Sequence, residues 1–296
     1  NKTKSYSVII PVLSEKKIPA LTPLFDALSK QNLPPDEIHL VVGDDRQGRA
    51  INFGVQNSST KYVATLDDDT EIDDPHLFEK LIDCISSDNS IGLVGAACEI
   101  PNYASNFQQK AMKEIPRRYF PKQSHHMDSD MVQHPCLLAE KKLFLDLGGE
   151  NEEMIRGLDP YLRKKFRDAG KRVVIAADTW VYHILPDNFS RLMKMYYRNG
   201  RGSAFAKMHY ASNIIELTDG YDNAKFVEKR SFIYRFFRRI LGIFVSLIRL
   251  RFIRFATDIA YMIGYIAELI NPGYITCSQV DNIKAELSDY KSIKIY

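Results

Sequence analysis

The chain has 296 residues, of which 45% are hydrophobic and 26% are charged, and its formal net charge at pH 7 is +3. This length allows one large domain, or one domain with an appendage, with the composition of an ordinary globular protein. The small net charge argues against a nucleic acid as partner. The charge is unevenly distributed, with acidic residues concentrated at 67–74 and 150–159 and basic residues at 110–122 and 229–254.

The cysteines and the N-terminus predict a cytoplasmic protein. The four cysteines lack the spacing of metal ligands and lie mostly in apolar runs, which predicts buried free thiols in a reducing compartment. They are Cys84, Cys98, Cys136 and Cys277. Lys2 and Lys4 lead almost directly into a predicted strand, so the pattern of a signal peptide is not seen.

The first hundred residues alternate between predicted strands and helices. Apolar, β-favouring runs predict strands at 6–11, 37–42, 62–66 and 91–100, and helical patterns occupy 22–28, 48–56 and 75–85. A strand–helix–strand order implies parallel pairing and right-handed crossovers. We therefore predict the α/β class, with a mixed, mainly parallel sheet flanked by helices.

Polar residues follow the first three predicted strands at the point where each strand ends. They are the stretch 11–15, the pair Asp44 and Asp45, and the stretch 67–69. Ligands of open α/β sheets bind beyond the carboxyl ends of the strands. The three strand ends therefore predict one shared binding site.

The stretch Asp67-Asp68-Asp69 places three adjacent carboxylates at the end of a short apolar strand. Such carboxylates repel one another unless they bind or face a cation, and oxygen ligands suit Mg²⁺ or Mn²⁺ bridged to a substrate phosphate. The alternative is an acidic turn that caps the next helix, because residues 73–75 are Asp-Asp-Pro.

Residues 101–133 show weak periodicity and several prolines, which predicts a long functional or mobile loop. Its two histidines, His125 and His126, allow two interpretations, a metal site or solvated loop residues, and we favour the second.

The following residues predict further strands at 135–139 and 173–177 and a helix at 140–147 that ends at Gly148-Gly149. Asp159 begins another predicted helix, where it is a functional carboxylate or simply an N-cap, since Pro160 follows it. His183 ends an extended piece, where it is a ligand or a structural residue.

Taken in this order, the motifs resemble those of family 2 glycosyltransferases with the GT-A fold, over residues 5–205. The motifs are Val8-Ile-Ile-Pro11 with Glu15, Val41-Val42-Gly43-Asp44-Asp45, Gly48-Arg-Ala-Ile-Asn52-Phe-Gly54, Leu66-Asp-Asp-Asp69, Leu147-Gly-Gly149, Gly157-Leu158-Asp159 and His183. The resemblance implies an inverting enzyme that uses a nucleotide-sugar, with Mn²⁺ or Mg²⁺ as cofactor.

The resemblance also implies a nucleotide-sugar site that comprises Pro11, Glu15, Asp44, Asp45, Asn52, Asp67, Asp68, Arg198 and Arg201. In that site Pro11 and Glu15 lie beside the base, and one of the pair 44–45 hydrogen-bonds a uracil-type base. Asp67 lies near the ribose or sugar. The arginines belong to a segment that closes over the diphosphate, for which the alternative is a solvated turn.

The resemblance assigns metal binding and proton transfer to other residues. Asp69 binds the metal that bridges the diphosphate, and His183 adds a metal contact. Asp159 matches the general base. A metal site with a separate carboxylate base implies a single displacement, and hence inversion.

Three features depart from the family's pattern. Ser14 stands where asparagine is common, and Leu158 replaces the glutamate that precedes the base. The interval from Asp45 to Gly48 is short, so that a helix and a strand common in the family are missing here.

Residues 231–270 carry six arginines among many Phe, Ile and Leu residues, and no uncharged apolar run approaches the ~20 residues of a membrane-spanning helix. This pattern predicts helices that lie in the membrane interface. The alternative is helices packed on the catalytic domain or on another subunit. We predict a catalytic domain at 1–210 and an amphipathic helical region at 211–296, with a polar tail from Asn271.

The function predicted is therefore transfer of a sugar from a nucleotide-sugar, with a UDP-sugar favoured, to a glycan or lipid-linked acceptor in surface glycan assembly. The enzyme would act at the cytoplasmic face of the cell membrane. One alternative is a nucleotidyltransferase, which would carry a glycine-rich basic loop after the first strand, and residues 11–17 are not such a loop. The other is a non-catalytic nucleotide-sugar-binding module, against which the joint presence of Asp67, Asp69, Asp159 and His183 argues.

Overall fold

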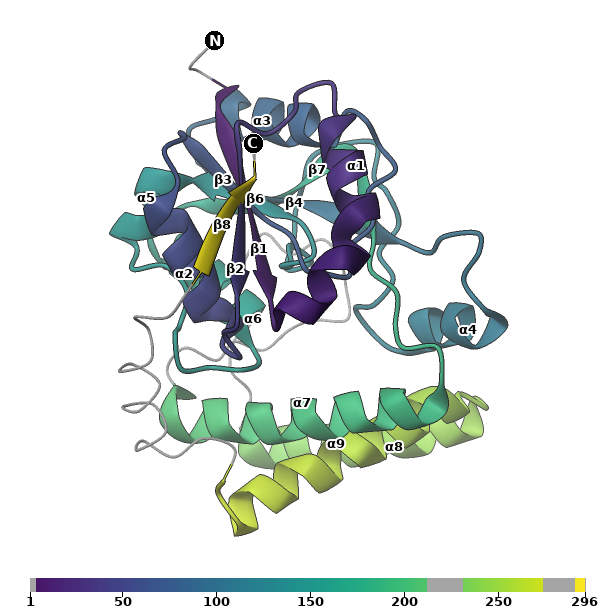
Figure 1. Ribbon diagram of the computed structural model, residues 1–296. Coiled ribbons are helices and arrows are strands. Elements are labelled where there is room, and N and C mark those ends of the chain that lie inside the picture. Colours follow the sequence, from purple (N-terminus) through teal and green to yellow (C-terminus); the bar gives the residue numbers. More distant parts are fainter. Residues whose placement is uncertain (1–3, 212–230, 274–290, 296) are drawn as a thin grey trace.

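A computed structural model describes residues 4–211, 231–273 and 291–295. Eight strands of this described part form one sheet in the order β5-β7-β4-β6-β3-β1-β2-β8 (Figure 1). The strands are β1 Tyr6–Val12, β2 Glu37–Val42, β3 Tyr62–Thr65, β4 Ile91–Glu99, β5 Met127–Asp128, β6 Leu137–Glu140, β7 Arg172–Tyr182 and β8 Lys291–Ile295. The helices are η2 Glu15–Leu21 (3-10), α1 Thr22–Ser29, α2 Gln47–Asn57, α3 Leu77–Ser87, α4 Asn106–Glu114, α5 Lys141–Asp146, α6 Leu158–Asp168, α7 Phe189–His209, α8 Phe232–Ile248 and α9 Phe252–Ile270.

The sheet is mixed, and most of its strands run in one direction. β1 pairs in parallel with β2 and β3, and β4 pairs in parallel with β7. β6 lies antiparallel between β3 and β4, so these two strands also run in the same direction. The predicted α/β class and mainly parallel sheet are thus confirmed, and β5, β6 and β8 run the opposite way.

Two apolar layers cover the two faces of the sheet. Along β1, Val8 and Ile10 face the layer that contains Phe78 of α3, while Ile9 faces the layer that contains Ile51 of α2. Strands buried on both faces are apolar almost throughout, as parallel strands between helices must be. Because the predicted strands are apolar runs of this kind, their positions are recovered closely from sequence.

The segment 101–133, predicted to be a long loop, contains regular structure. Ser105 and Gln108 form a capping box that begins α4, and β5 pairs with β7 at the edge of the sheet. Phe120 is buried and pairs with Cys98 through backbone hydrogen bonds. The capping box provides local hydrogen bonds that a search for apolar periodicity does not detect.

The helices α7, α8 and α9 form a layer beyond the carboxyl ends of β1 and β2 (Figure 1). α9 packs directly on α7, and Arg201 of α7 forms an ion pair with Glu268 of α9, at 2.6 Å between Nη2 and Oε2. The carboxylate of Glu114 in α4 accepts hydrogen bonds from the first backbone N–H groups of α9. Among the described helices, none is both long and apolar enough to cross a membrane.

The end of the chain differs from the polar tail predicted from Asn271 onwards. Residues Lys291–Ile295 form β8, which extends the sheet by pairing antiparallel with β2. The pairing partner lies some 250 residues earlier in sequence, so a local pattern could not reveal it. Of the cysteines, Cys84 and Cys136 are buried free thiols and Cys98 is a half-buried one, while Cys277 lies outside the described residues.

Candidate active site

Asp67, Asp69 and His183 come together beyond the carboxyl end of β3. His183 Nε2 lies 3.1 Å from Asp69 Oδ1 and 3.7 Å from Asp67 Oδ2, and one donor atom from each residue falls within 4.8 Å of the others. Two carboxylates and an imidazole are a donor set that suits Mn²⁺ or Mg²⁺. The residues therefore fit the divalent cation that the sequence predicted.

Backbone pairing explains how His183 reaches the aspartates. His183 directly follows β7, which is separated from β3 by β4 and β6. The loop after the aspartates crosses this interval, and Glu71 and Tyr182 exchange two backbone hydrogen bonds of 2.9 Å. The residue after Tyr182 is thereby held beside Asp69.

The charges within this cluster act on one another. Burial raises the pKa of Asp67 to about 6, with the charge of His183 opposing and that of Asp69 adding to the shift. Burial also opposes ionisation of Asp69, but the hydrogen bond and charge of His183 outweigh it and lower its pKa. A cluster with competing carboxylate charges is a place where a cation is stabilised.

The remaining members of the aspartate triplet and its surroundings have their own partners. Gln47, at the start of α2, donates to Asp67 Oδ1 at 2.5 Å. Lys17 of η2 forms an ion pair with Asp68 at 2.6 Å. Asp68 is thus directed to η2, and the outer two aspartates are the ones that meet His183.

The two aspartates at the end of β2 differ in their accessibility. The Asp44 side chain is fully buried, and Arg49 donates to both of its oxygens at 2.6 Å. The backbone N–H of Arg46 also donates to Asp44. The Asp45 side chain is 58% exposed, so it is the carboxylate of this pair that a ligand can reach.

Asn52 is buried and bonds within the protein. Its side chain accepts from the backbone N–H of Glu150 at 2.8 Å and donates to the backbone carbonyl of Glu150 at 3.0 Å. Gly149, with a φ of +56°, makes this contact possible, because a Cβ there would lie 2.4 Å from Asn52 Oδ1. In this structure Asn52 therefore fixes the loop after α5.

Asp159 lies in the first turn of α6, with its side chain 33% exposed. Its Oδ1 atom accepts hydrogen bonds from the backbone N–H of His134 at 2.8 Å and from His134 Nδ1 at 2.5 Å. The other ring nitrogen, Nε2, lies 2.7 Å from Glu150 Oε1. His134 and Glu150 were not predicted as site residues, since neither belongs to a recognisable motif and they meet only through the fold.

The remaining predicted donor-site residues lie on β1, η2 and α7. Pro11 is half-buried in β1, and Glu15 begins η2. Arg198 is exposed on α7, whereas Arg201 is engaged by Glu268.

Arg118 is a further cation near the site that sequence reasoning missed. Its Nε donates to the hydroxyl of Tyr196 at 3.1 Å, and its charge acts on both His183 and Asp159. Interaction with Tyr196 raises the pKa of Arg118, although burial opposes its charge. The guanidinium thus adds positive charge that acts on His183 of the candidate metal site.

The histidines of the segment 101–133 stay outside the cluster. His125 and His126 are both exposed, and His126 Nδ1 accepts a hydrogen bond from the backbone of Ala177 at 3.0 Å. Their positions agree with solvated loop residues, the interpretation that we favoured.

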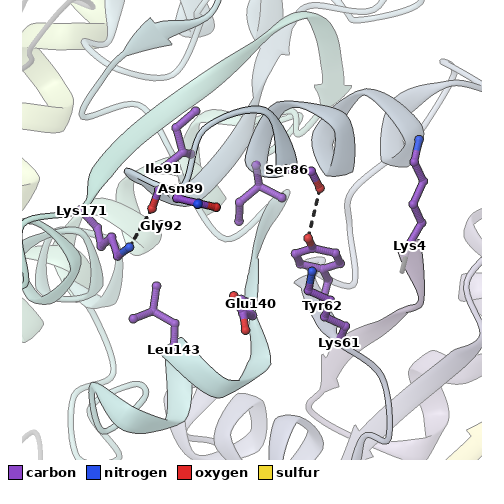
Figure 2. Close-up of a pocket in the computed structure, with 11 residues that line it drawn as sticks. Lys4, Lys61, Tyr62, Ser86, Asn89, Ile91, Gly92, Glu140, Leu143 and Lys171 are labelled. Atoms are coloured by element: carbon purple, nitrogen blue, oxygen red, sulfur yellow. Dashed lines mark hydrogen bonds between the residues drawn. The ribbon is translucent and has the colours of Figure 1, made fainter. Parts of the chain in front are cut away.

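A pocket of about 400 Å³ lies elsewhere, at the amino ends of β3 and β4 (Figure 2). Its cations have partners of their own: Lys171 donates to the Asn89 carbonyl at 2.7 Å, and Lys4 forms an ion pair with Asp83. None of the predicted site residues lines it. The candidate site lies at the opposite edge of the sheet, beyond the carboxyl ends of the strands.

Residues 42–145 match the family model of glycosyl transferase family 2. The family resemblance predicted from the motifs is confirmed. The matched residues include the family 2 motifs at Asp44-Asp45, Asn52 and Asp67–Asp69, whereas Asp159 and His183 lie beyond them. The search of curated proteins found no match to the chain.

Solved glycosyltransferases have similar structures. One is the mannosyltransferase PcManGT from Pyrobaculum calidifontis in complex with GDP-Man and Mn²⁺, with 13% identity, a TM-score of 0.52, and 97% of this chain and 81% of that one covered. Another is S. aureus TarS 1-349 in complex with UDP-GlcNAc, with 15% identity and a TM-score of 0.46. The match covers 69% of this chain and 67% of that one. At these identities the first likeness establishes the fold, which is GT-A.

Proposed function

We propose that this protein is an inverting, metal-dependent glycosyltransferase that moves a sugar from a nucleotide-sugar to a hydroxyl group. The observation that carries the proposal is the meeting of Asp67, Asp69 and His183 at the carboxyl edge of the sheet. Asp159 supplies a separate carboxylate, near enough for its charge to act on Asp67. A cation site and a distinct base are the two parts that the reaction requires.

Each of these residues has a task in the transfer. Asp67, Asp69 and His183 would hold Mn²⁺ or Mg²⁺, which supplies positive charge against the nucleoside diphosphate formed as the sugar–phosphate bond breaks. Asp159 accepts the proton of the acceptor hydroxyl. The oxygen of that hydroxyl attacks the anomeric carbon from the face opposite to the leaving diphosphate. The electron pair of the broken bond leaves with the diphosphate, so that the anomeric configuration is inverted.

The donor site proposed here combines the accessible residues of the three strand ends. Asp45 is the exposed carboxylate for the base, with Pro11 and Glu15 beside it, and a UDP-sugar is the donor that we favour. Arg118 and Arg198 supply cations for the diphosphate. Arg201, which pairs with Glu268, acts by holding α9 on α7.

We also propose that the helical layer binds the cytoplasmic face of a membrane. Exposed apolar residues recur along one stripe of α8 and one of α9, and they are Ile233, Phe237, Leu241, Phe244, Ile248, Ile259, Ile263, Ile266 and Ile270. Arg238, Arg239 and Arg249 are exposed beside them, which suits anionic lipid. The opposite side of α9 packs on α7, so the region 231–270 combines protein packing with an exposed apolar face.

The helical layer lies beyond the carboxyl ends of the strands (Figure 1), the edge at which we propose the active site. A glycan or lipid-linked acceptor at a membrane surface would meet that edge, which fits a role in surface glycan assembly. In this proposal residues 1–210 form the catalytic domain and residues 211–296 form the appended region, of which the strand β8 joins the catalytic sheet.

The test is a screen of UDP- and GDP-sugars for transfer and for metal-stimulated hydrolysis, with Mn²⁺ first, since that ion accompanies GDP-Man in the mannosyltransferase complex. We expect release of one nucleoside diphosphate that depends on Mn²⁺ or Mg²⁺. Binding of a nucleotide-sugar without any turnover would instead favour a binding module. Release of pyrophosphate from a nucleoside triphosphate would favour a nucleotidyltransferase.

A further inference from the structure

We propose that His134, held by Glu150, is a positioning residue that fixes one oxygen of Asp159 and leaves the other oxygen free for the acceptor hydroxyl. This inference rests on the proposed function, because it assigns a task to Asp159. It adds two residues, His134 and Glu150, that no family motif in this chain includes.

The geometry at Asp159 is asymmetric. Two donors from the same residue, the backbone N–H and the Nδ1 of His134, meet on Oδ1 at 2.8 and 2.5 Å. Within the described part of the chain, Oδ2 makes no hydrogen bond, and the side chain is one third exposed. A carboxylate clamped through one oxygen presents the other in a fixed direction, which is what a base needs.

Glu150 fixes the imidazole from its other side. His134 Nε2 lies 2.7 Å from Glu150 Oε1, and the Glu150 side chain is fully buried. The backbone of Glu150 is in turn held by Asn52 through hydrogen bonds to its N–H and its carbonyl. The line Asn52–Glu150–His134–Asp159 therefore connects α2 to α6 through the loop that precedes β6.

The two short contacts define the protonation state of His134. A neutral imidazole donates through one nitrogen and accepts through the other, whereas both nitrogens here face carboxylate oxygens. Burial opposes the charge of His134, but Asp159 and Glu150 outweigh it and raise its pKa well above the usual range. The geometry and the direction of the pKa shift both favour the imidazolium form of His134.

The same pairing keeps Asp159 ionised. Burial opposes the charge of Asp159, but the charge and hydrogen bonds of His134, together with the charge of Arg163, hold its pKa well below the usual range. The charges of Arg118 and Asp67 also act on Asp159. As the pH rises through the raised pKa of His134, the imidazolium is lost, the clamp on Asp159 loosens, and turnover falls.

The first measurement is a nuclear magnetic resonance titration of the histidine ring nitrogens, which needs no substrate. We expect both ring nitrogens of His134 to keep their protons at a pH above ~6.5, the ordinary pKa of a histidine side chain. Glu150→Gln and Asp159→Asn should each shift the His134 titration to lower pH. A wild-type His134 that is neutral at pH 7 would overturn the inference even if the protein transfers sugar.

The second measurement is turnover. His134→Asn should lower kcat by at least about tenfold, within the ~10²–10⁴-fold contribution of a general base, with unchanged affinity for a nucleoside diphosphate and Mn²⁺. Glu150→Gln should move the alkaline limb of the pH profile of kcat to lower pH. The control variant His125→Asn should change neither kcat nor the position of that limb. If the wild type is active, two results contradict the inference. One is a full kcat in His134→Asn, and the other is an alkaline limb that does not move in Glu150→Gln.

A folding defect can be separated from the loss of positioning. His134→Asn leaves Glu150 buried without its counter-charge, which destabilises the fold. The double variant His134→Asn, Glu150→Gln removes both charges and should recover thermal stability while kcat stays low. Recovery of kcat together with stability would assign His134 a purely structural role. No turnover in the wild type with any donor would instead refute the proposed function itself.

Discussion

Gly200 of α7 lies so close to Tyr261 of α9 that a Cβ at position 200 would stand 2.0 Å from the Tyr261 carbonyl oxygen. The contact is reciprocal, since a Cβ on Gly264 of α9 would stand 2.0 Å from the Tyr197 carbonyl oxygen. Such close approach of two helices requires residues without side chains at the crossing point. The pair of glycines thus holds the helical layer together.

Gly200→Ala should therefore separate α7 from α9 and destabilise the protein by about 1–3 kcal/mol, the usual cost of overpacking. Gly242→Ala in α8 is the matched control, because nothing lies within 4 Å of a Cβ there. We expect the control to stabilise the helix by roughly 0.5–1 kcal/mol. Denaturant unfolding measures both, and equal shifts would refute the close contact.

Asp69→Asn should abolish metal-dependent nucleotide binding, because it removes a charged ligand that lies 3.1 Å from His183. We expect the affinity for UDP in the presence of Mn²⁺ to fall at least about tenfold, or about 1.4 kcal/mol. Asp73→Asn makes the same charge change at an exposed residue outside the cluster, and should bind as the wild type does. Calorimetry with and without Mn²⁺ measures the affinity for UDP. An affinity in Asp69→Asn that depends on Mn²⁺ as in the wild type would refute the metal site.

Asp159→Asn should lower turnover by ~10²–10⁴-fold, as expected for loss of a general base. Donor affinity should be kept, because the metal ligands are untouched, and the fold should survive, because asparagine tolerates a position at a helix start. Asp168→Asn at the exposed end of α6 is the control. Retained turnover would place the base elsewhere, with Glu152 or Glu153 as the next candidates, and collapsed donor binding would move Asp159 into the donor site.

Arg118→Gln should weaken donor binding at least about tenfold with little change in metal affinity. The reason is that the charge of Arg118 acts on His183 of the proposed metal site, while its Nε donates to the hydroxyl of Tyr196. Arg191→Gln, at an exposed position in the first turn of α7, is the control. Calorimetry with UDP and Mn²⁺ measures the difference, and equal affinity in the two variants would exclude Arg118 from the diphosphate site.

Leu241→Asp and Phe244→Asp should reduce flotation of the full chain with vesicles that contain anionic lipid. Each removes a large exposed apolar side chain from the stripe on α8, and burial of such a side chain is worth roughly 1.5–3 kcal/mol. Phe189→Asp, an equally exposed apolar residue at the start of α7, is the control. Flotation that is equal in all variants, or absent in the wild type, would leave protein packing as the role of the layer.

The sequence by itself determined the fold class and identified the residues of the candidate metal site. Apolar runs located the strands because strands buried on both faces must be apolar along most of their length. The position of Asp67 and Asp69 followed from the rule that ligands gather at carboxyl strand ends. His183 and Asp159 came from the order of the motifs, since no local pattern distinguishes them from structural residues.

Tertiary structure decided which candidate residues remain open to a ligand and which are used within the protein. Arg49 holds Asp44, the loop after Gly149 holds Asn52, and Glu268 holds Arg201, so these side chains stabilise the fold around the site. Each partner is fixed by side-chain geometry at distances of a few ångströms, which residue types and spacing do not encode.

Long-range pairing explains the residues that were missed. His134 reaches Asp159 because β6 runs antiparallel between β3 and β4, and β8 reaches β2 across most of the chain. Sequence periodicity reports which face of an element is buried, but it does not report which distant element covers that face. The positioning of Asp159 by His134 was therefore decided by the fold alone.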